Sequence, residues 1–205
     1  MINLNNADKK NKSFMYQNLQ KSKCYNSDFS NSNFDYVSFR GAHMKSCKFN
    51  DCTFKGTEFI GTNLKESLFK NASFENAVFE GAKLEGVDFK GAKFKKTIFV
   101  STSLEGVLNL NTEDPNLEIY SDMPDFEIDA RLKAEIEKLM SNAYVKKSRV
   151  LDTKDKKMNM ISVKVLLDYF GEEKLLLCLS KVDAQLDRDF YTLSYIIKMI
   201  EKMNA

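Results

Sequence analysis

The stretch NASFENAVFEGAKLEGVDFKGAKFKKTIF, residues 71–99, places an apolar residue at every fifth position. The same register runs without insertion from Phe14 to Leu104 and holds nineteen apolar residues, thirteen of which are phenylalanine. Because a helix repeats about every 3.6 residues and a strand every two, no single amphipathic element fits a period of five. The chain must therefore turn every five residues, and we call the apolar residue of each five-residue unit its centre.

The residues around each centre indicate how a unit is built. Small residues stand two positions before most centres, and seven of the eight glycines stand two positions after one. Alternation along an extended stretch puts the small residue and the centre on the same side, with the residue between them pointing outward. Glycine after the centre supplies the backbone freedom that a tight turn needs. Each unit is thus predicted to form one side of a coil.

The centres that are not phenylalanine give the number of sides. Met44, Leu64, Leu84 and Leu104 recur every twenty residues, so four units complete one turn. Successive turns then stack like residue on like residue, one strand spacing of about 4.8 Å apart. The sequence predicts a four-sided solenoid with these core residues: Phe29, Phe34, Phe39, Phe49, Phe54, Phe59, Leu64, Phe69, Phe74, Phe79, Leu84, Phe89, Phe94, Phe99 and Leu104.

The units ASFEN (72–76), AKLEG (82–86) and AKFKK (92–96) resemble the pentapeptide-repeat family, whose consensus is close to Ala-(Asp/Asn)-Leu-x-x. The resemblance covers about residues 14–108. It implies a mainly β fold, a right-handed quadrilateral β-helix with the centre and the small residue inward. Lys12 and Gln17 at small positions and Cys24 at a centre depart from the pattern, so we expect an irregular first coil.

Composition divides the chain into four segments. Residues 1–13 are polar and are expected to precede a β-helix over 14–110. Seven acidic and no basic residues lie from Glu113 to Asp129, so 111–128 are predicted to form an acidic connector. The spacing of apolar residues over 129–205 predicts a small α-helical domain, in which we recognise no family. Its expected helices span 132–144, 160–170 (ended by Gly171), 172–186 and 189–203.

Composition also excludes several classes of protein. Apolar residues make up 43% and charged residues 29% of the chain, which is typical of a soluble protein and excludes a membrane class. A polar N-terminus and four cysteines without a secretory signal favour a cytoplasmic protein with reduced thiols. The single histidine, His43, is predicted to point outward, and Cys24, Cys47 and Cys52 inward. We therefore expect no enzyme, metal, cofactor or small-molecule substrate.

One side of the predicted solenoid has unusual outward residues. On the side centred by Phe39, Phe59, Phe79 and Phe99, half of the flanking outward residues are aliphatic. From residue 28 onward, only Leu68 is aliphatic at the corresponding positions of the other sides. Such a cluster predicts a docking surface, occupied by the chain's own C-terminal helices, by a second copy or by a separate protein. Its expected members are Ile60, Val78, Ile98 and Val100.

These observations favour a non-enzymatic protein–protein interaction scaffold, in which the solenoid face and the helical domain mediate self-association or partner binding. The family resemblance implies an alternative, DNA-mimic binding of gyrase or topoisomerase IV as in quinolone resistance. That mechanism needs an acidic surface. Residues 1–110 instead carry 16 basic against 11 acidic residues, a net charge of +5. A nucleic-acid partner is also disfavoured, because the lysines are interspersed with acidic residues and few aromatic residues point outward.

Overall fold

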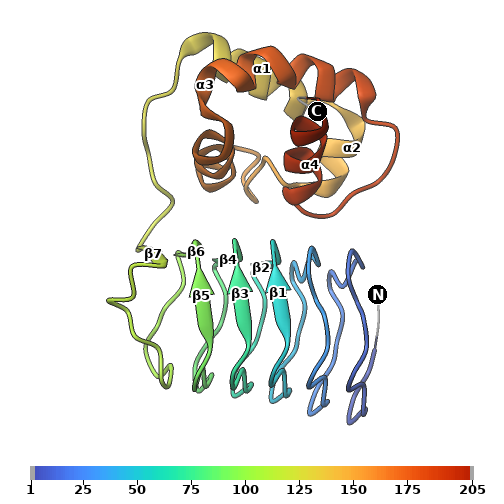
Figure 1. Ribbon diagram of the computed structural model, residues 1–205, viewed down its shortest axis with the longest axis vertical. Coiled ribbons are helices and arrows are strands. Elements are labelled where there is room, and N and C mark those ends of the chain that lie inside the picture. The colour runs from blue at the N-terminus through green and yellow to red at the C-terminus, as the bar shows by residue number, and fades with distance from the viewer. Residues whose placement is uncertain (1–2, 204–205) are drawn as a thin grey trace. The chain divides into compact units, whose positions relative to one another are not determined.

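The computed structural model describes residues 3–203 and divides into two compact units between Asp122 and Met123. We call residues 3–122 the solenoid unit and residues 123–203 the helical unit (Figure 1). Residues 1–2 and 204–205, which belong to the expected N-terminal segment and helical domain, lie outside the described residues.

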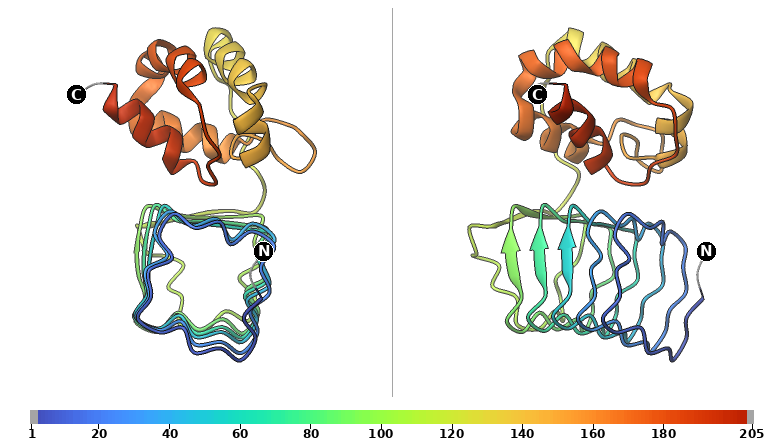
Figure 2. Two further views of the ribbon diagram at one scale, coloured as in Figure 1. Left: turned by 90° about the vertical axis from the view of Figure 1, so that its right-hand side faces the viewer. Right: turned by 45° about the vertical axis from the view of Figure 1, so that its right-hand side comes forward.

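Residues twenty positions apart pair in parallel along the solenoid unit, from Asn3 with Lys23 to Val100 with Tyr120. Viewed along the coils, successive turns follow one square outline (Figure 2, left). Backbone N–H groups donate to carbonyl groups of the next coil, as from Phe39 to Glu58 at 2.8 Å. The predicted four-sided β-solenoid, followed by helices, is confirmed.

Two sides of the square contain regular strands. The first parallel sheet has the order β1 (Thr53–Lys55), β3 (Ser73–Glu75) and β5 (Lys93–Lys95). In the second parallel sheet, the centres Phe59, Phe79 and Phe99 pair in register. Its strands, in order, are β2 (Glu58–Ile60), β4 (Val78–Glu80), β6 (Thr97–Val100) and β7 (Leu117–Tyr120).

The inward side chains form columns of stacked phenylalanine rings. Rings twenty residues apart lie nearly parallel, and the centroids of Phe59 and Phe79 are 4.5 Å apart. Rings from different sides meet edge to face, as Phe79 and Phe89 do at 6.2 Å, and both arrangements are favourable for aromatic pairs. All the expected core residues lie in this cluster, in which Phe94 and Leu104 are partly buried and the others are buried.

The small position of each unit often carries a hydrogen-bond donor. The Thr57 hydroxyl donates to the Phe34 carbonyl at 2.8 Å, and the Thr62 hydroxyl donates to the Phe39 carbonyl at 2.9 Å. Serine and cysteine make the same contact elsewhere in the solenoid, always to the centre of the previous coil. A buried hydrogen bond of this kind contributes about 1 kcal/mol to stability. The preference for serine, threonine and cysteine therefore reflects hydrogen bonding as well as size.

The residue two positions after each centre turns the corner with a positive φ. Gly86 has φ 72°, and a Cβ added there would lie 3.4 Å from the Cγ of Glu66 in the preceding coil. At Gly91, φ is 69° and the added Cβ would lie 2.6 Å from the side-chain oxygen of Asn71. Asn71 itself turns its corner with φ 56°, a conformation that asparagine tolerates better than most residues.

The solenoid begins earlier than expected. The prediction of a separate N-terminal segment is wrong for residues 3–13, which form the first half of the first coil and pair with the second coil through Asn3 and Asp8. Leu4 occupies a centre and packs against the core, and Lys9 occupies the next one with its N–H bonded to the Asp28 carbonyl at 2.7 Å. Backbone pairing with the next coil holds this polar stretch in place.

The solenoid also ends later than expected, inside the predicted acidic connector. Asn109 adopts a left-handed φ of 56°, and its side chain donates to Asp88 Oδ1 at 2.7 Å. Leu110, next to this turn, packs against the core, and the spacing of twenty residues is kept beyond it, where Phe99 pairs with Ile119. The chain then forms β7, which extends the second sheet before the solenoid unit ends at Asp122.

The helical unit forms a second hydrophobic core. Asp129 caps the first helix by accepting hydrogen bonds from the N–H groups of Arg131 and Leu132. Apolar residues from all the helices pack together, with Leu132, Leu166 and Ile196 fully buried. The helices are α1 (Ala130–Met140), α2 (Ala143–Ser148), α3 (Met160–Gln185) and α4 (Ser194–Lys202).

The helix boundaries differ from the prediction at two points and agree with it at a third. The expected helix over 132–144 is interrupted because Asn142 caps a new helix by accepting from the Tyr144 N–H. The break expected at Gly171 is confirmed, because this glycine has non-helical backbone angles (φ 70°, ψ 166°) and kinks α3 at that point. The last helix begins at Ser194 instead of residue 189.

The phenylalanine column predicts a sharp dependence of stability on the centres. We expect Phe59→Ala to lower the free energy of unfolding by about 3–5 kcal/mol, because it leaves a cavity between the stacked rings of two neighbouring coils. Phe59→Leu should cost less, since leucine already serves as a centre at position 64. Urea unfolding followed by circular dichroism measures both, with the exposed Thr53→Ala as control. Equal midpoints for Phe59→Ala and the control would contradict the stacking argument.

Candidate functional site

The aliphatic face comprises Ile60, Val78, Ile98 and Val100, on strands β2, β4 and β6 of the second sheet. Each of these residues flanks an inward phenylalanine, so its side chain points outward. The backbone register places Val78 beside Ile98 in one row. In the other row, Glu80 stands between Ile60 and Val100.

Burial distinguishes the members of the aliphatic face from one another. Ile60 and Val78 are half-buried, whereas Ile98 and Val100 are 4% and 0% exposed. Strand β7 continues the sheet past Ile98 and Val100 and pairs them with Glu118 and Tyr120. The sequence pattern predicted a common direction for these residues but gave no ranking of their exposure.

The charged neighbours of the aliphatic face are mainly acidic. Glu58, Glu80 and Glu118 occupy outward positions in the same two rows, together with Arg40 from the preceding coil. The Tyr120 hydroxyl donates a hydrogen bond to Glu118 Oε2 at 2.8 Å. The face thus combines aliphatic side chains with three carboxylates, of which that of Glu58 is buried, and one guanidinium.

Other sides of the solenoid carry ladders of ion pairs. Lys55 and Lys95 both contact Glu75 Oε1 at 3.3 Å, and Lys45 contacts Glu66 at 3.2 Å. Hydrogen bonds from Ser46 and Lys45 lower the pKa of the Glu66 carboxyl. Because such exposed pairs contribute little to stability, these residues mainly solvate the coils.

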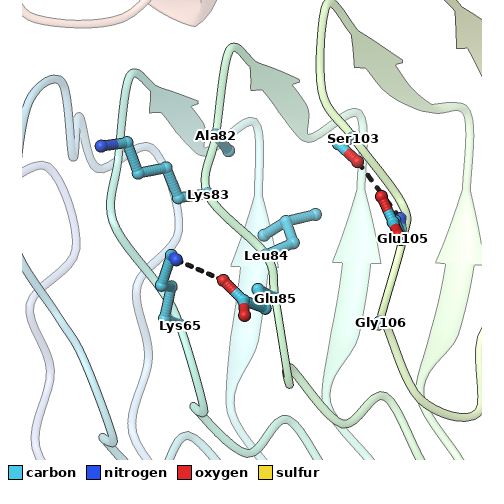
Figure 3. Close-up of a pocket in the computed structure, with 8 residues that line it drawn as sticks. All are labelled: Lys65, Ala82, Lys83, Leu84, Glu85, Ser103, Glu105 and Gly106. Atoms are coloured by element: carbon cyan, nitrogen blue, oxygen red, sulfur yellow. Dashed lines mark hydrogen bonds and ion pairs between the residues drawn. The ribbon is translucent and has the colours of Figure 1, made fainter.

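A shallow hollow of about 590 Å³ opens on the side centred by Leu84, close to the end of the solenoid (Figure 3). Within residues 3–203, Lys83 and Ser103 are twenty positions apart but do not form a backbone bridge. The Gly86 N–H donates to the Gly106 carbonyl. Lys65 bonds Glu85 across the hollow. None of the eight lining residues is a histidine or cysteine.

The cysteines are buried in the protein, and the single histidine lies on its surface. All four cysteines are buried and free, and burial raises the pKa of the Cys47 and Cys52 thiols to about 12. His43 is exposed. Among residues 3–203, no three histidine, cysteine or acidic side chains are grouped so as to hold a metal ion. The same part of the chain contains no helix long and apolar enough to cross a membrane.

The raised pKa values predict inert thiols. At pH 8 only about one in ten thousand Cys47 or Cys52 side chains carries the reactive thiolate, because this pH lies about four units below a pKa of about 12. We expect a disulfide reagent such as DTNB to label them in folded protein only as fast as the chain unfolds, and at once in urea. Rapid labelling of the Cys47 or Cys52 peptide without denaturant, identified by mass spectrometry, would contradict their burial.

The fold and its surfaces define a β-solenoid protein of stacked five-residue units. Residues 18–51 and 45–98 match two family models described as pentapeptide repeats, of eight and nine copies. The repeat region therefore belongs to the pentapeptide-repeat family, as its residues indicated. Neither match extends into the helical unit, and no curated protein sequence matches the chain.

Several solved structures are similar to this chain. A pentapeptide repeat protein of Nostoc Pcc 7120 is 17% identical over 52% of this chain and 84% of its own, with a TM-score of 0.33. One from the thylakoid lumen of Arabidopsis thaliana is 18% identical over 84% and 88%, with a TM-score of 0.31. QnrB1, a plasmid-mediated fluoroquinolone resistance protein, is 11% identical over 68% and 99%, with a TM-score of 0.30. At these values the likenesses carry no argument about function.

Proposed function

We propose that this protein is a non-enzymatic interaction scaffold that binds protein through the aliphatic face of its solenoid. The observation that carries the proposal is the gathering of Ile60, Val78, Ile98 and Val100 on one sheet, while other sides carry charged ladders. Outward positions in this solenoid have no packing role in the core, so aliphatic side chains there favour contact with another surface.

The stacked coils make the aliphatic face a suitable platform. Its strands are joined to one another by backbone hydrogen bonds and stand on the buried column that contains Phe59, Phe79 and Phe99. A surface that is already ordered loses little conformational entropy when a partner binds. Burying the exposed parts of Ile60 and Val78, the two members that are not already buried, would contribute about 25 cal/mol per Å² of apolar area.

A second copy of the chain is the occupant we test first, because symmetric self-association is the commonest form of protein assembly. Two sheets packed face to face lie about 10 Å apart, close enough for outward aliphatic side chains to interdigitate. The buried, unpaired thiols of Cys24, Cys47, Cys52 and Cys178 favour a reducing compartment such as the cytoplasm for this assembly.

Replacing Ile60 by lysine tests the proposal. We expect Ile60→Lys to reduce self-association about tenfold, because it places a charge in an apolar contact. Size-exclusion chromatography with light scattering over a concentration series measures the change. The matched control is Leu68→Lys, which makes the same substitution at an exposed aliphatic residue on another side of the solenoid and should leave the association unchanged.

A second measurement extends the test to a separate partner. A photo-crosslinking residue at position 60, and the same residue at position 68 as control, is activated in cells and in purified protein. A crosslinked product supports the proposal if it forms at position 60 but not at position 68 and if mass spectrometry identifies the second peptide in it. A monomeric wild-type protein with no product specific to position 60 would overturn it.

A further inference from the structure

The helical unit contains a hollow that the sequence pattern did not predict. It measures about 690 Å³ and lies between the end of α1, helix α2 and the loop that follows α2. Met140, which is half-buried, gives it an apolar floor, and the buried Val145 and Leu151 lie beneath this floor. This volume falls within the range of about 300–1,000 Å³ that is usual for ligand pockets.

The loop that forms one wall is held in place by specific bonds. Arg149 ends α2 with a left-handed φ of 61°, and its guanidinium donates to Asp152 Oδ1 at 3.1 Å and to the Thr153 carbonyl at 2.6 Å. Asp152 also forms an antiparallel bridge with Met158, and the Thr153 N–H donates to the Lys157 carbonyl at 2.8 Å. The hollow is therefore a built feature of the helical unit.

The rim of the hollow is positively charged. Lys146, Lys154 and Lys156 line it and are exposed. Among residues 3–203, no carboxylate lies within 4.0 Å of these three ammonium groups, whereas Lys147 nearby pairs with Asp189. Glu137 also lines the hollow. The segment 146–157 carries six basic against two acidic residues, so positive charge on the rim is uncompensated within the segment.

We propose that this hollow binds an acidic peptide segment that carries an aliphatic or aromatic side chain. The apolar side chain of the peptide packs on Met140, and the carboxylates beside it face Lys154 and Lys156. The combination of an apolar floor with a cationic rim matches a ligand that has both chemistries within a few residues. Charge complementarity of this kind raises the association rate and selects the partner.

The lining residues disfavour other anionic partners. A nucleic-acid strand is usually held by aromatic side chains that stack on its bases, and none of the ten lining residues is aromatic. A membrane surface is bound by apolar side chains that protrude into it, whereas Val145 and Leu151 lie recessed beneath the floor. An acidic peptide needs neither feature.

The proposal extends the scaffold function to the helical unit but does not depend on the aliphatic face. The two sites lie on different units and are built from different residues. The Ile60→Lys variant, which tests the aliphatic face, should therefore bind an acidic peptide as tightly as the wild type does. Failure of one proposal leaves the other intact.

Fluorescence anisotropy with the full-length protein tests the hollow. The probe is a short fluorescein-labelled peptide in which pairs of glutamate alternate with single phenylalanines. We expect saturable binding that weakens as salt is added, because the rim contacts are screened. Lys154→Glu combined with Lys156→Glu should weaken binding about tenfold, since two attractive contacts become repulsive. The control, Lys181→Glu with Lys202→Glu, makes the same change of charge at exposed residues outside the lining.

Two altered peptides and two other ligands complete the test. Replacing glutamate by glutamine, or phenylalanine by serine, should each abolish most of the binding. Equal weakening by the control variant, or unchanged binding of either altered peptide, would overturn the proposal. The proposal would also be overturned if single-stranded RNA or phosphatidylserine vesicles bound more tightly than the probe peptide, and if the Lys154/Lys156 double variant abolished that binding. Circular dichroism verifies that each variant remains folded.

Discussion

The solenoid unit depends on the placement of each residue over the residue twenty positions later. Backbone hydrogen bonds join the coils, and rings such as Phe59 and Phe79 stack at the same spacing inside them. Hydroxyl and thiol donors at the small positions, Thr57 among them, tie each coil to the centre of the previous one. Because each coil contacts only its neighbours, these local bonds determine the whole unit.

This arrangement separates the residues that build the core from those that form the surface. Inward positions are committed to rings and small donors, whereas outward positions are free to vary without disturbing the core. Most outward positions carry charged side chains that solvate the coils. Ile60 and Val78 are exceptions, and they do not pack in the core of the solenoid. The helical unit reverses the pattern, because there apolar residues lie at the floor of a hollow and cations form its rim. The two units therefore offer surfaces of different chemistry.

The periods of five and twenty predicted the sides, the core and the direction of the aliphatic residues, since each follows from local repetition. The ends of the solenoid escaped prediction because backbone pairing tolerates a polar centre such as Lys9, and because this pairing continues past Asn109 to β7. The hollow in the helical unit escaped for another reason. Val145 and Leu151 belong to a helix and a loop that are joined by the side-chain hydrogen bonds of Arg149 to Asp152 and Thr153, which a pattern of apolar residues does not reveal.

The square cross-section has a consequence for changes in chain length. One extra pentapeptide between β4 and β6 would leave every inward place filled, yet it would turn all later units by a quarter of the square. Ile98 and Val100 would then move to the adjacent side, and the row shared by Val78 and Ile98 would be divided. Four extra pentapeptides would lengthen the solenoid and keep that row on a single side. An insertion or deletion therefore preserves a surface of this fold only when it adds or removes whole turns of four pentapeptides.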